Sequence, residues 1–288
     1  MMTNIIHNSI LKAQFSNKGA ELISLKYYDK ELIWPALEPW KRHAPILFPI
    51  VGKLKDDFYY YQNQKYYLSQ HGFARDKEWL CTFQNETFIE FELTDDADTF
   101  KHYPFHFSII AQYSLNNNSL NIHFQILNPY HYPMPFSLGY HPAFYSPHQL
   151  NNYYLKFLPH QQEIISSSLN NGLLTHLNNT INLDNSTLKL NTSLFDNDAI
   201  VLEKQNIEEI QIHNDKDDYY ISIISKGLKN WGIWTKPKCN DFICIEPWMG
   251  IADVENHNHI IEQKKDIILL QPYQIWEWDI LISINENK

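Results

Sequence analysis

An alternation of apolar and polar residues with a period of two runs along the whole chain and constrains its fold more than any other feature. Four segments show it clearly: 88–93 (FIEFEL), 120–126 (LNIHFQI), 220–224 (YISII) and 276–284 (WEWDILISI). A period of two places successive side chains on opposite faces of a strand, so each segment is predicted to be a β-strand with one buried face. Polar turns, for example at 115–119 and 214–218, separate such segments. Many short strands with frequent turns predict an all-β sandwich or barrel.

Length and composition are compatible with one large β-domain. The chain has 288 residues, of which 44% are hydrophobic and 15% aromatic, enough for a sizeable core. The stretch 149–193 is more polar and less periodic. We interpret it as a long excursion at the edge of the sandwich, because a linker is normally rich in Pro, Gly or Ser. We therefore expect a single domain over residues 1–288.

Charge and hydropathy argue against two classes of partner. The formal net charge is −10, whereas surfaces that bind nucleic acid are built from clustered Lys and Arg. The apolar stretches are far shorter than the roughly 18 residues of a spanning helix, and the N-terminus lacks the pattern of a secretion signal. We expect no nucleic-acid partner, no membrane association and a cytoplasmic location.

The sequence does not indicate a metal or a nucleotide cofactor. Cys81, Cys239 and Cys244 form no CxxC motif, so we predict three unpaired thiols and no thiolate zinc site. His257 and His259 would share one face of a strand, but their Asn- and Glu-rich surroundings favour a solvated loop, and a third ligand at typical spacing is missing from the sequence. Glycine-rich phosphate loops and a Gly-x-Ser-x-Gly elbow are missing as well.

Glu246 is the first candidate for chemistry. It follows the apolar run 242–245 and precedes Pro247, so it is expected at the end of a buried strand. Burial would raise its pKa toward neutrality, as a general base acting on a hydroxyl group requires. The alternative is a Glu that caps a turn or pairs with a surface Lys.

Two histidines are further candidates. His141 is followed by Pro142 and flanked by aromatic residues that would exclude water, and imidazole exchanges protons near pH 7. His71 precedes Gly72, which allows a ligand to approach the backbone closely, and Arg75 offers a planar fork of donors to the oxygens of a ligand. For each histidine the alternative is a hydrogen-bonded, partly buried side chain without a catalytic role.

Six stretches in the same order along the chain are similar to those of one family. They are 42–53 (RHAPILFPIVGK), 70–75 (QHGFAR), 103–107 (YPFHF), 134–144 (MPFSLGYHPAF), 198–199 (DA) and 245–250 (IEPWMG). In these stretches the chain resembles the aldose 1-epimerase (galactose mutarotase-like) superfamily, in a branch related to the LacX proteins. The resemblance implies a large twisted β-sandwich of the galactose mutarotase-like (supersandwich) type with an open sugar site on its concave face.

The resemblance also implies the chemistry and the partner, a hexose. Glu246 resembles the general base that removes the proton from the C1 hydroxyl, and His141 the acid that protonates the ring oxygen. The ring of an aldohexose then opens to the aldehyde and closes as the other anomer, without a cofactor. One group must be ionised while the other is protonated, so their surroundings must separate the two pKa values.

Four more residues are carried over as sugar ligands. His71 resembles the second histidine, which binds near the ring oxygen, and Arg75 and Asp198 resemble ligands of sugar hydroxyls. Asp196 lies two positions from Asp198 and would share its face in a strand, so the choice between them stays open. Lys53 is also expected to bind substrate, although many relatives carry Arg there, and Tyr140 stands where many carry Gly.

Two other functions fit the same sequence. Epimerisation of a hexose 6-phosphate would need a cluster of basic residues, for which Arg42, Lys53, Lys55 and Arg75 are the few candidates near the motifs. A sugar-binding module without catalysis would not need both Glu246 and His141. We expect a monomer or a homodimer.

Overall fold

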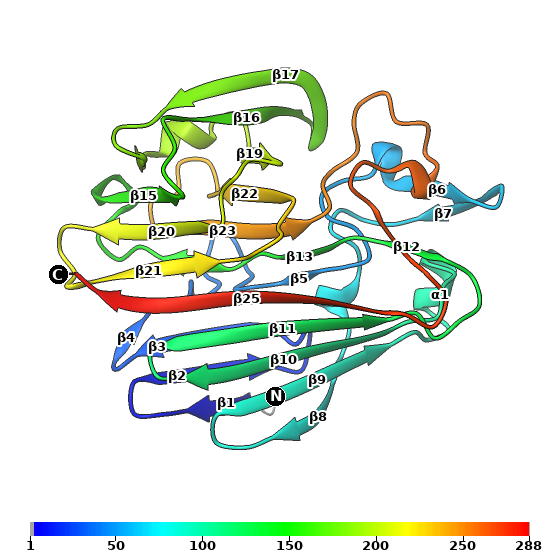
Figure 1. Cartoon of the computed structure of the whole chain (residues 1–288), viewed down its shortest axis with the longest axis horizontal. Helices are drawn as coiled ribbons and strands as arrows, with labels where there is room; N and C mark the ends of the chain where they lie inside the picture. The colour runs from blue at the N-terminus through cyan, green and yellow to red at the C-terminus, as the bar shows by residue number, and fades with distance from the viewer. Residues whose placement is uncertain (1–2, 288) are drawn as a thin grey trace.

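The computed structural model describes residues 3–287 and consists mainly of antiparallel strands (Figure 1). Two large sheets dominate. The nine-stranded sheet contains, in spatial order, β18 (Thr187–Lys189), β15 (Tyr153–Leu158), β20 (Glu209–Asn214), β21 (Tyr219–Ile224), β25 (Ile275–Glu286), β11 (Ser119–Leu127), β10 (Ser108–Asn116), β9 (Phe88–Thr94) and β8 (Leu80–Gln84). The eight-stranded sheet contains β17 (Leu173–Asn182), β16 (Glu163–Asn170), β19 (Ile200–Glu203), β22 (Asn230–Trp234), β23 (Phe242–Met249), β13 (Leu138–Tyr140) and β5 (Ile46–Leu47), with β14 (Ala143–Tyr145) also paired to β23. The all-β prediction is confirmed.

Three smaller sheets and a few helical turns complete the fold. The small sheets are formed by β1 (Thr3–His7), β2 (Leu11–Ser16), β3 (Leu22–Tyr27) and β4 (Lys30–Glu31), by β6 (Phe58–Tyr61) and β7 (Gln64–Tyr67), and by β12 (Met134–Phe136) and β24 (Ile268–Leu270). The single α-helix of the described part is α1 (Thr99–His102), and 3-10 turns lie at η1 (Lys55–Asp57), η2 (Ala74–Asp76), η3 (Leu150–Asn152), η4 (Thr192–Phe195) and η5 (Ile261–Gln263). Between residues 3 and 287 the chain forms no helix that is long and apolar enough to cross a membrane.

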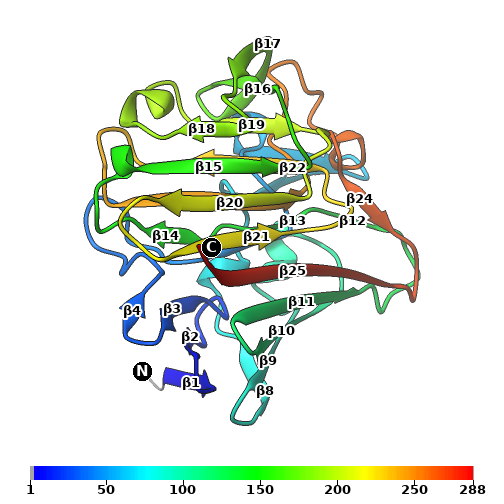
Figure 2. The ribbon, with the colours of Figure 1, turned by 60° about the vertical axis from the view of Figure 1, so that its left-hand side comes forward.

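The main hydrophobic core lies between the two large sheets, which Figure 2 shows stacked. On β11, buried Ile122 and Phe124 alternate with polar residues that are only half-buried. They share one apolar cluster with Ile243 and Ile245 of β23 in the opposite sheet. Burial of apolar surface stabilises the fold by about 25 cal/mol per Å², so the alternation fixes which face of β11 turns inward.

The predicted strands and turns are found where the alternation put them. Segment 88–93 lies in β9, 120–126 in β11, 220–224 in β21 and 276–284 in β25. The turn at 115–119 joins β10 to β11, and Asn117 adopts a positive φ of 51° there, which Asn tolerates better than most residues.

The stretch 149–193 lies at the edge of both large sheets, but it is more regular than its sequence suggested. It forms four strands, of which β15 and β18 end one sheet and β16 and β17 end the other. On β17 most side chains between Thr175 and Asn182 are exposed, which explains the polar composition.

Candidate active site

Glu246 owes its position to the central strand β23. All eight residues of this strand are buried, so both of its faces are covered. Ile243 and Ile245 point into the core between the sheets, whereas Phe242, Cys244 and Glu246 have the opposite parity and point to the other face. Glu246 is only 2% exposed. The sequence-based expectation of a carboxylate on a buried strand is confirmed, although the strand continues past Pro247 to Met249.

His141 reaches Glu246 through a break between two short strands. β13 and β14 both pair with β23, with Gly139 opposite Trp248 and Ala143 opposite Cys244. Residues 141 and 142 therefore run alongside β23, next to Glu246. Nε2 of His141 lies 3.2 Å from Oε2 of Glu246, and His141 is 7% exposed. The pair is close enough for direct proton exchange.

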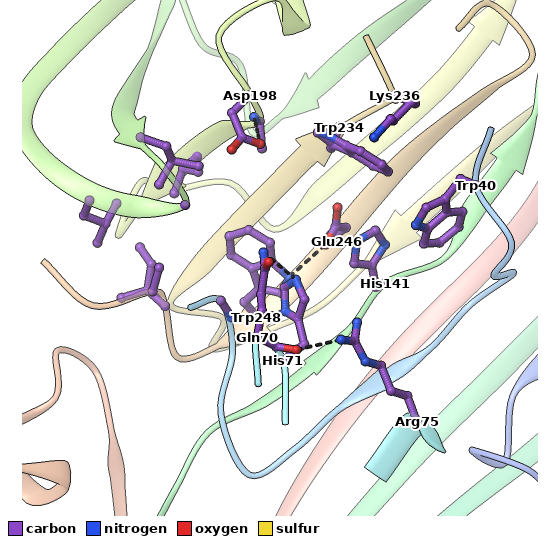
Figure 3. Close-up of a pocket in the computed structure, with 18 residues that line it drawn as sticks. Trp40, Gln70, His71, Arg75, His141, Asp198, Trp234, Lys236, Glu246 and Trp248 are labelled. Atoms are coloured by element: carbon purple, nitrogen blue, oxygen red, sulfur yellow. Dashed lines mark hydrogen bonds and ion pairs between the residues drawn. The ribbon is translucent and has the colours of Figure 1, made fainter. Parts of the chain in front are cut away.

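The pair lies in a cavity of about 380 Å³, which Figure 3 shows in close-up. Its polar lining consists of Gln70, His71, Arg75, His141, Asp198, Lys236 and Glu246. Three indoles, from Trp40, Trp234 and Trp248, form aromatic walls. A cavity with aromatic walls and a few converging polar groups is the usual form of a small-molecule site.

Trp40 contacts the side chain of His141, and Trp248 contacts that of Glu246. The ring of Trp40 stacks on that of His141 at a centroid distance of 5.1 Å. Nε1 of Trp248 donates a hydrogen bond to Oε2 of Glu246 over 3.2 Å. A Cβ at Gly232 on the neighbouring strand would lie 2.2 Å from the indole of Trp248, so only glycine leaves room for this ring. The three indoles and Lys236 were not predicted as site residues, although Trp248 has the same strand parity as Glu246.

His71 lies on a turn that places its ring beside His141. The ring centroids are 5.8 Å apart, and the His71 ring is held by the backbone of Gly52, whose N–H donates to Nδ1 over 3.1 Å. Arg75 follows on η2 and donates from Nη2 to the carbonyl of Gln70 over 2.6 Å. Both residues line the cavity.

The two remaining predicted ligands differ in outcome. Asp198 lines the cavity and Asp196 is not among its lining residues. The expectation that both share a strand face is wrong, because they lie in the turn between η4 and β19, where Asp198 adopts a φ of 84°. Lys53 is not a lining residue either. The alkyl part of its side chain lies against Gly172 at the edge of the cavity, where a Cβ on that glycine would be 3.5 Å away.

The buried surroundings shift both members of the pair toward their neutral forms. Burial and, to a smaller extent, the charge of Asp198 raise the pKa of Glu246 well above its ordinary value, against the hydrogen bond from Trp248. Burial and the charges of Arg75 and Arg42 lower the pKa of His141 to about 3. A protonated Glu246 beside a neutral His141 holds the same single proton as a carboxylate beside an imidazolium. Moving that proton across one contact converts the first state into the second.

Among residues 3–287, one group of ligand atoms could hold a metal. Ligand atoms of His141, Cys244 and Glu246 lie within 4.8 Å of one another, and all three residues are buried. Burial raises the pKa of Cys244 well above its ordinary value and so disfavours the thiolate that a metal would bind. Cys81 and Cys239 are free as well, as predicted. His257 and His259 lie in a loop, where His257 is buried and His259 stacks on Phe58, so the solvated loop expected for them is wrong in this respect.

Comparisons with known proteins place the chain in a family. The family model of aldose 1-epimerase matches residues 2–280. The plasmid-encoded LacX protein of Lactococcus lactis subsp. lactis is 30% identical over 285 residues, which cover 94% of this chain and 95% of that protein.

Solved structures agree in fold over the whole chain. A galactose mutarotase related enzyme from Lactobacillus acidophilus is 32% identical, with a TM-score of 0.94 and full coverage of both chains. A galactose mutarotase-like protein from Lactobacillus casei is 26% identical, with a TM-score of 0.90 and coverage of 99% of this chain and 100% of that one. These matches include every stretch that carries the cavity, and the chain belongs to the aldose 1-epimerase family.

Proposed function

We propose that the chain is a mutarotase that interconverts the α and β anomers of an aldohexose by acid and base catalysis. One observation carries the proposal: a buried carboxyl and a buried imidazole lie 3.2 Å apart in a cavity of about 380 Å³. Membership of the aldose 1-epimerase family supports the same reaction. A pair of groups whose surroundings shift their pKa values in opposite directions suits a reaction that needs an acid and a base together.

Because Glu246 and His141 share one proton, the pair can act as base and acid in the same step. In its ionic state, Glu246 as carboxylate removes the proton from the C1 hydroxyl while His141 as imidazolium protonates the ring oxygen. The C1–O5 bond breaks, and the electron pair of the former O1–H bond becomes part of the aldehyde carbonyl. After rotation about C1–C2 the C5 hydroxyl attacks the other carbonyl face, and the two protons move back. The enzyme then has its original proton count.

The remaining polar residues bind the sugar. The N–H of Gly52 occupies Nδ1 of His71, so the neutral ring carries its proton on Nε2 and donates from there toward a sugar oxygen. Arg75 and Asp198 offer donors and acceptors to hydroxyl groups at the edge of the cavity. Trp40, Trp234 and Trp248 present flat apolar surfaces to the C–H faces of a pyranose.

The test is the relaxation of optical rotation after fresh α-D-glucose or α-D-galactose is dissolved. The protein should accelerate it, and Glu246→Gln should reduce the acceleration by about 10²- to 10⁴-fold, the usual contribution of a general base. Glu277→Gln is the matched control, because this Glu is exposed on β25, away from the cavity. A Glu246→Gln variant with near-normal activity would rule out Glu246 as the base.

A hexose 6-phosphate is the second candidate substrate, because Lys236 lines the cavity and the described residues give it no ion-pair partner. Comparing free and phosphorylated sugars in one assay decides between them, and Lys236→Met should weaken only the use of the phosphorylated sugar. Tight sugar binding without any anomerisation would instead favour a non-catalytic binding module.

A further inference from the structure

Two hydrogen bonds join His71 to Gly52. The N–H of His71 donates to the carbonyl of Gly52 over 2.9 Å, and the N–H of Gly52 donates to Nδ1 of His71 over 3.1 Å. His71 adopts a φ of 67° to make both contacts. A non-glycine residue in this region is strained and persists only where its surroundings impose it.

Gly52 in turn is fixed by residues on its other side. A Cβ on Gly52 would lie 2.6 Å from Ala252, so the two backbones are in direct contact. The next residue, Asp253, joins the same segment at two points: its N–H donates to the carbonyl of Lys53 over 2.9 Å, and its Oδ2 accepts from the N–H of Lys55 over 2.9 Å. Asp253 therefore anchors the segment that directly follows Gly52.

Asp253 forms a fully buried ion pair. Its Oδ1 lies 2.9 Å from Nζ of Lys264, and the two side chains are 1% and 0% exposed. Although burial raises it, contacts with His257 and Lys264 bring the pKa of Asp253 down to about 2, so the carboxylate is ionised. Burying two charges is costly, and apolar residues of similar volume often serve stability equally well. Neither residue lines the cavity.

We propose that Lys264 and Asp253 are positioning residues that hold segment 52–55 so that the N–H of Gly52 keeps His71 in its substrate-donating tautomer. Lys264 orients the carboxylate, the carboxylate fixes the backbone of Lys55, and this backbone sets the direction of the Gly52 N–H. The carbonyl of Asp253 also accepts from the N–H of Leu174 over 2.8 Å, so the same residue fixes a second wall of the cavity. The inference rests on the proposed function, because it gives His71 a role in donating to the ring oxygen.

The decisive variant combines Lys264→Met with Asp253→Leu. It removes both charges and the acceptor for the Lys55 N–H at nearly constant volume. Replacing the buried ion pair by apolar side chains should cost little stability, and the Lys55 N–H left without an acceptor should lower the thermal midpoint only slightly. The kcat should fall by up to about 10²-fold with little change in KM, because the displaced His71 donor would act on the ring oxygen mainly as charge develops there in the transition state. Lys264→Met with Asp253→Asn keeps an oxygen acceptor for Lys55 and should retain most of the activity.

A control separates positioning from general stability. Lys30→Met with Asp217→Asn removes an ion pair that does not line the cavity and should leave kcat unchanged. If the Lys264→Met/Asp253→Leu variant loses stability while its folded fraction keeps the parental kcat, the inference is wrong.

Two measurements on the unaltered protein remain decisive even if the double variants do not fold. The imidazole ¹⁵N spectrum of His71 should show a protonated Nε2 and an unprotonated Nδ1, and the amides of Gly52 and Lys55 should exchange with solvent as slowly as core amides. Rapid exchange at Gly52 or a protonated Nδ1 would overturn the inference. Neither readout needs catalysis, so each stands even if sugar epimerisation itself is not found.

Discussion

The raised pKa of the buried Glu246 makes the stability of the folded chain depend on pH. Because burial raises its pKa above the ordinary 4.5, the folded chain binds this proton more tightly than the unfolded chain. The resulting stabilisation is complete below pH 4.5 and is lost as the pH rises through the raised value. Glu246→Gln keeps the shape and cannot ionise. Its thermal midpoint should therefore exceed that of the parent by an amount that grows with pH, measured by calorimetry from pH 4 to 9; a constant difference would contradict the raised pKa.

The pH dependence of activity reports on the shared proton. The reactive pair holds one proton between a lower limit near 3, set by the lowered pKa of His141, and an upper limit set by the raised pKa of Glu246. The rate constant kcat/KM should therefore be level through mild acid and fall on the alkaline side. Polarimetry at constant ionic strength measures it. An activity that rises through pH 4 to 5, as for an ordinary ionising carboxylate, would contradict the arrangement.

At the scale of residues, the sequence predicts the polar residues of the cavity better than the aromatic side chains that contact them. Glu246, His141, His71, Arg75 and Asp198 were predicted and line one cavity, since resemblance transfers motifs residue by residue. The indoles of Trp40 and Trp234 were missed, because their contacts with His141 join segments about 100 residues away in each direction. Such contacts leave no periodic signal in the sequence.

At the scale of elements, the close packing of Gly232 on β22 against Trp248 on β23 can be tested by substitution. In Gly232→Ala the new Cβ would meet the indole of Trp248 at 2.2 Å and displace it from Glu246. Overpacking of this kind typically costs about 1–3 kcal/mol, and losing the indole contact should also lower kcat. Gly227→Ala is the control, since no atom lies within 4 Å of its added Cβ. Its φ of +68° makes alanine strained, so stability should fall while the activity of the folded protein stays unchanged.

The strands that could be predicted from the sequence are those with only one buried face. β9 and β11 alternate cleanly because one side of each is less buried, whereas β23 is buried on both sides and shows no alternation that identifies its faces. β13 and β14 are three residues each, too short for a periodic pattern. The break between them, which brings His141 to Glu246, therefore became visible only in the structure.

At the scale of the whole molecule, the site depends on sheets that share one core. The apolar cluster contains residues from β2 near the N-terminus, for example Phe15, and from β25 near the C-terminus, for example Ile284. It also contains Ile245, next to Glu246 on β23. The inner face of β23 thus contributes to the stability of the fold, while its other face carries Glu246, the proposed general base.

A shared core predicts that the chain unfolds as one unit. Far-UV circular dichroism follows the strands, and tryptophan fluorescence follows the tertiary packing around all eight Trp residues, three of which line the cavity. The two signals should give the same urea midpoint and the same slope. Leu155→Ala at the β15 edge and Phe91→Ala on β9 remove buried side chains at opposite ends of the nine-stranded sheet. Each should lower both midpoints together, because truncating a buried Leu or Phe costs about 2–5 kcal/mol. If Leu155→Ala shifted only the fluorescence transition, or proteolysis within 149–193 left a stably folded fragment, the chain would contain two independent units and the expectation of a single domain would be wrong.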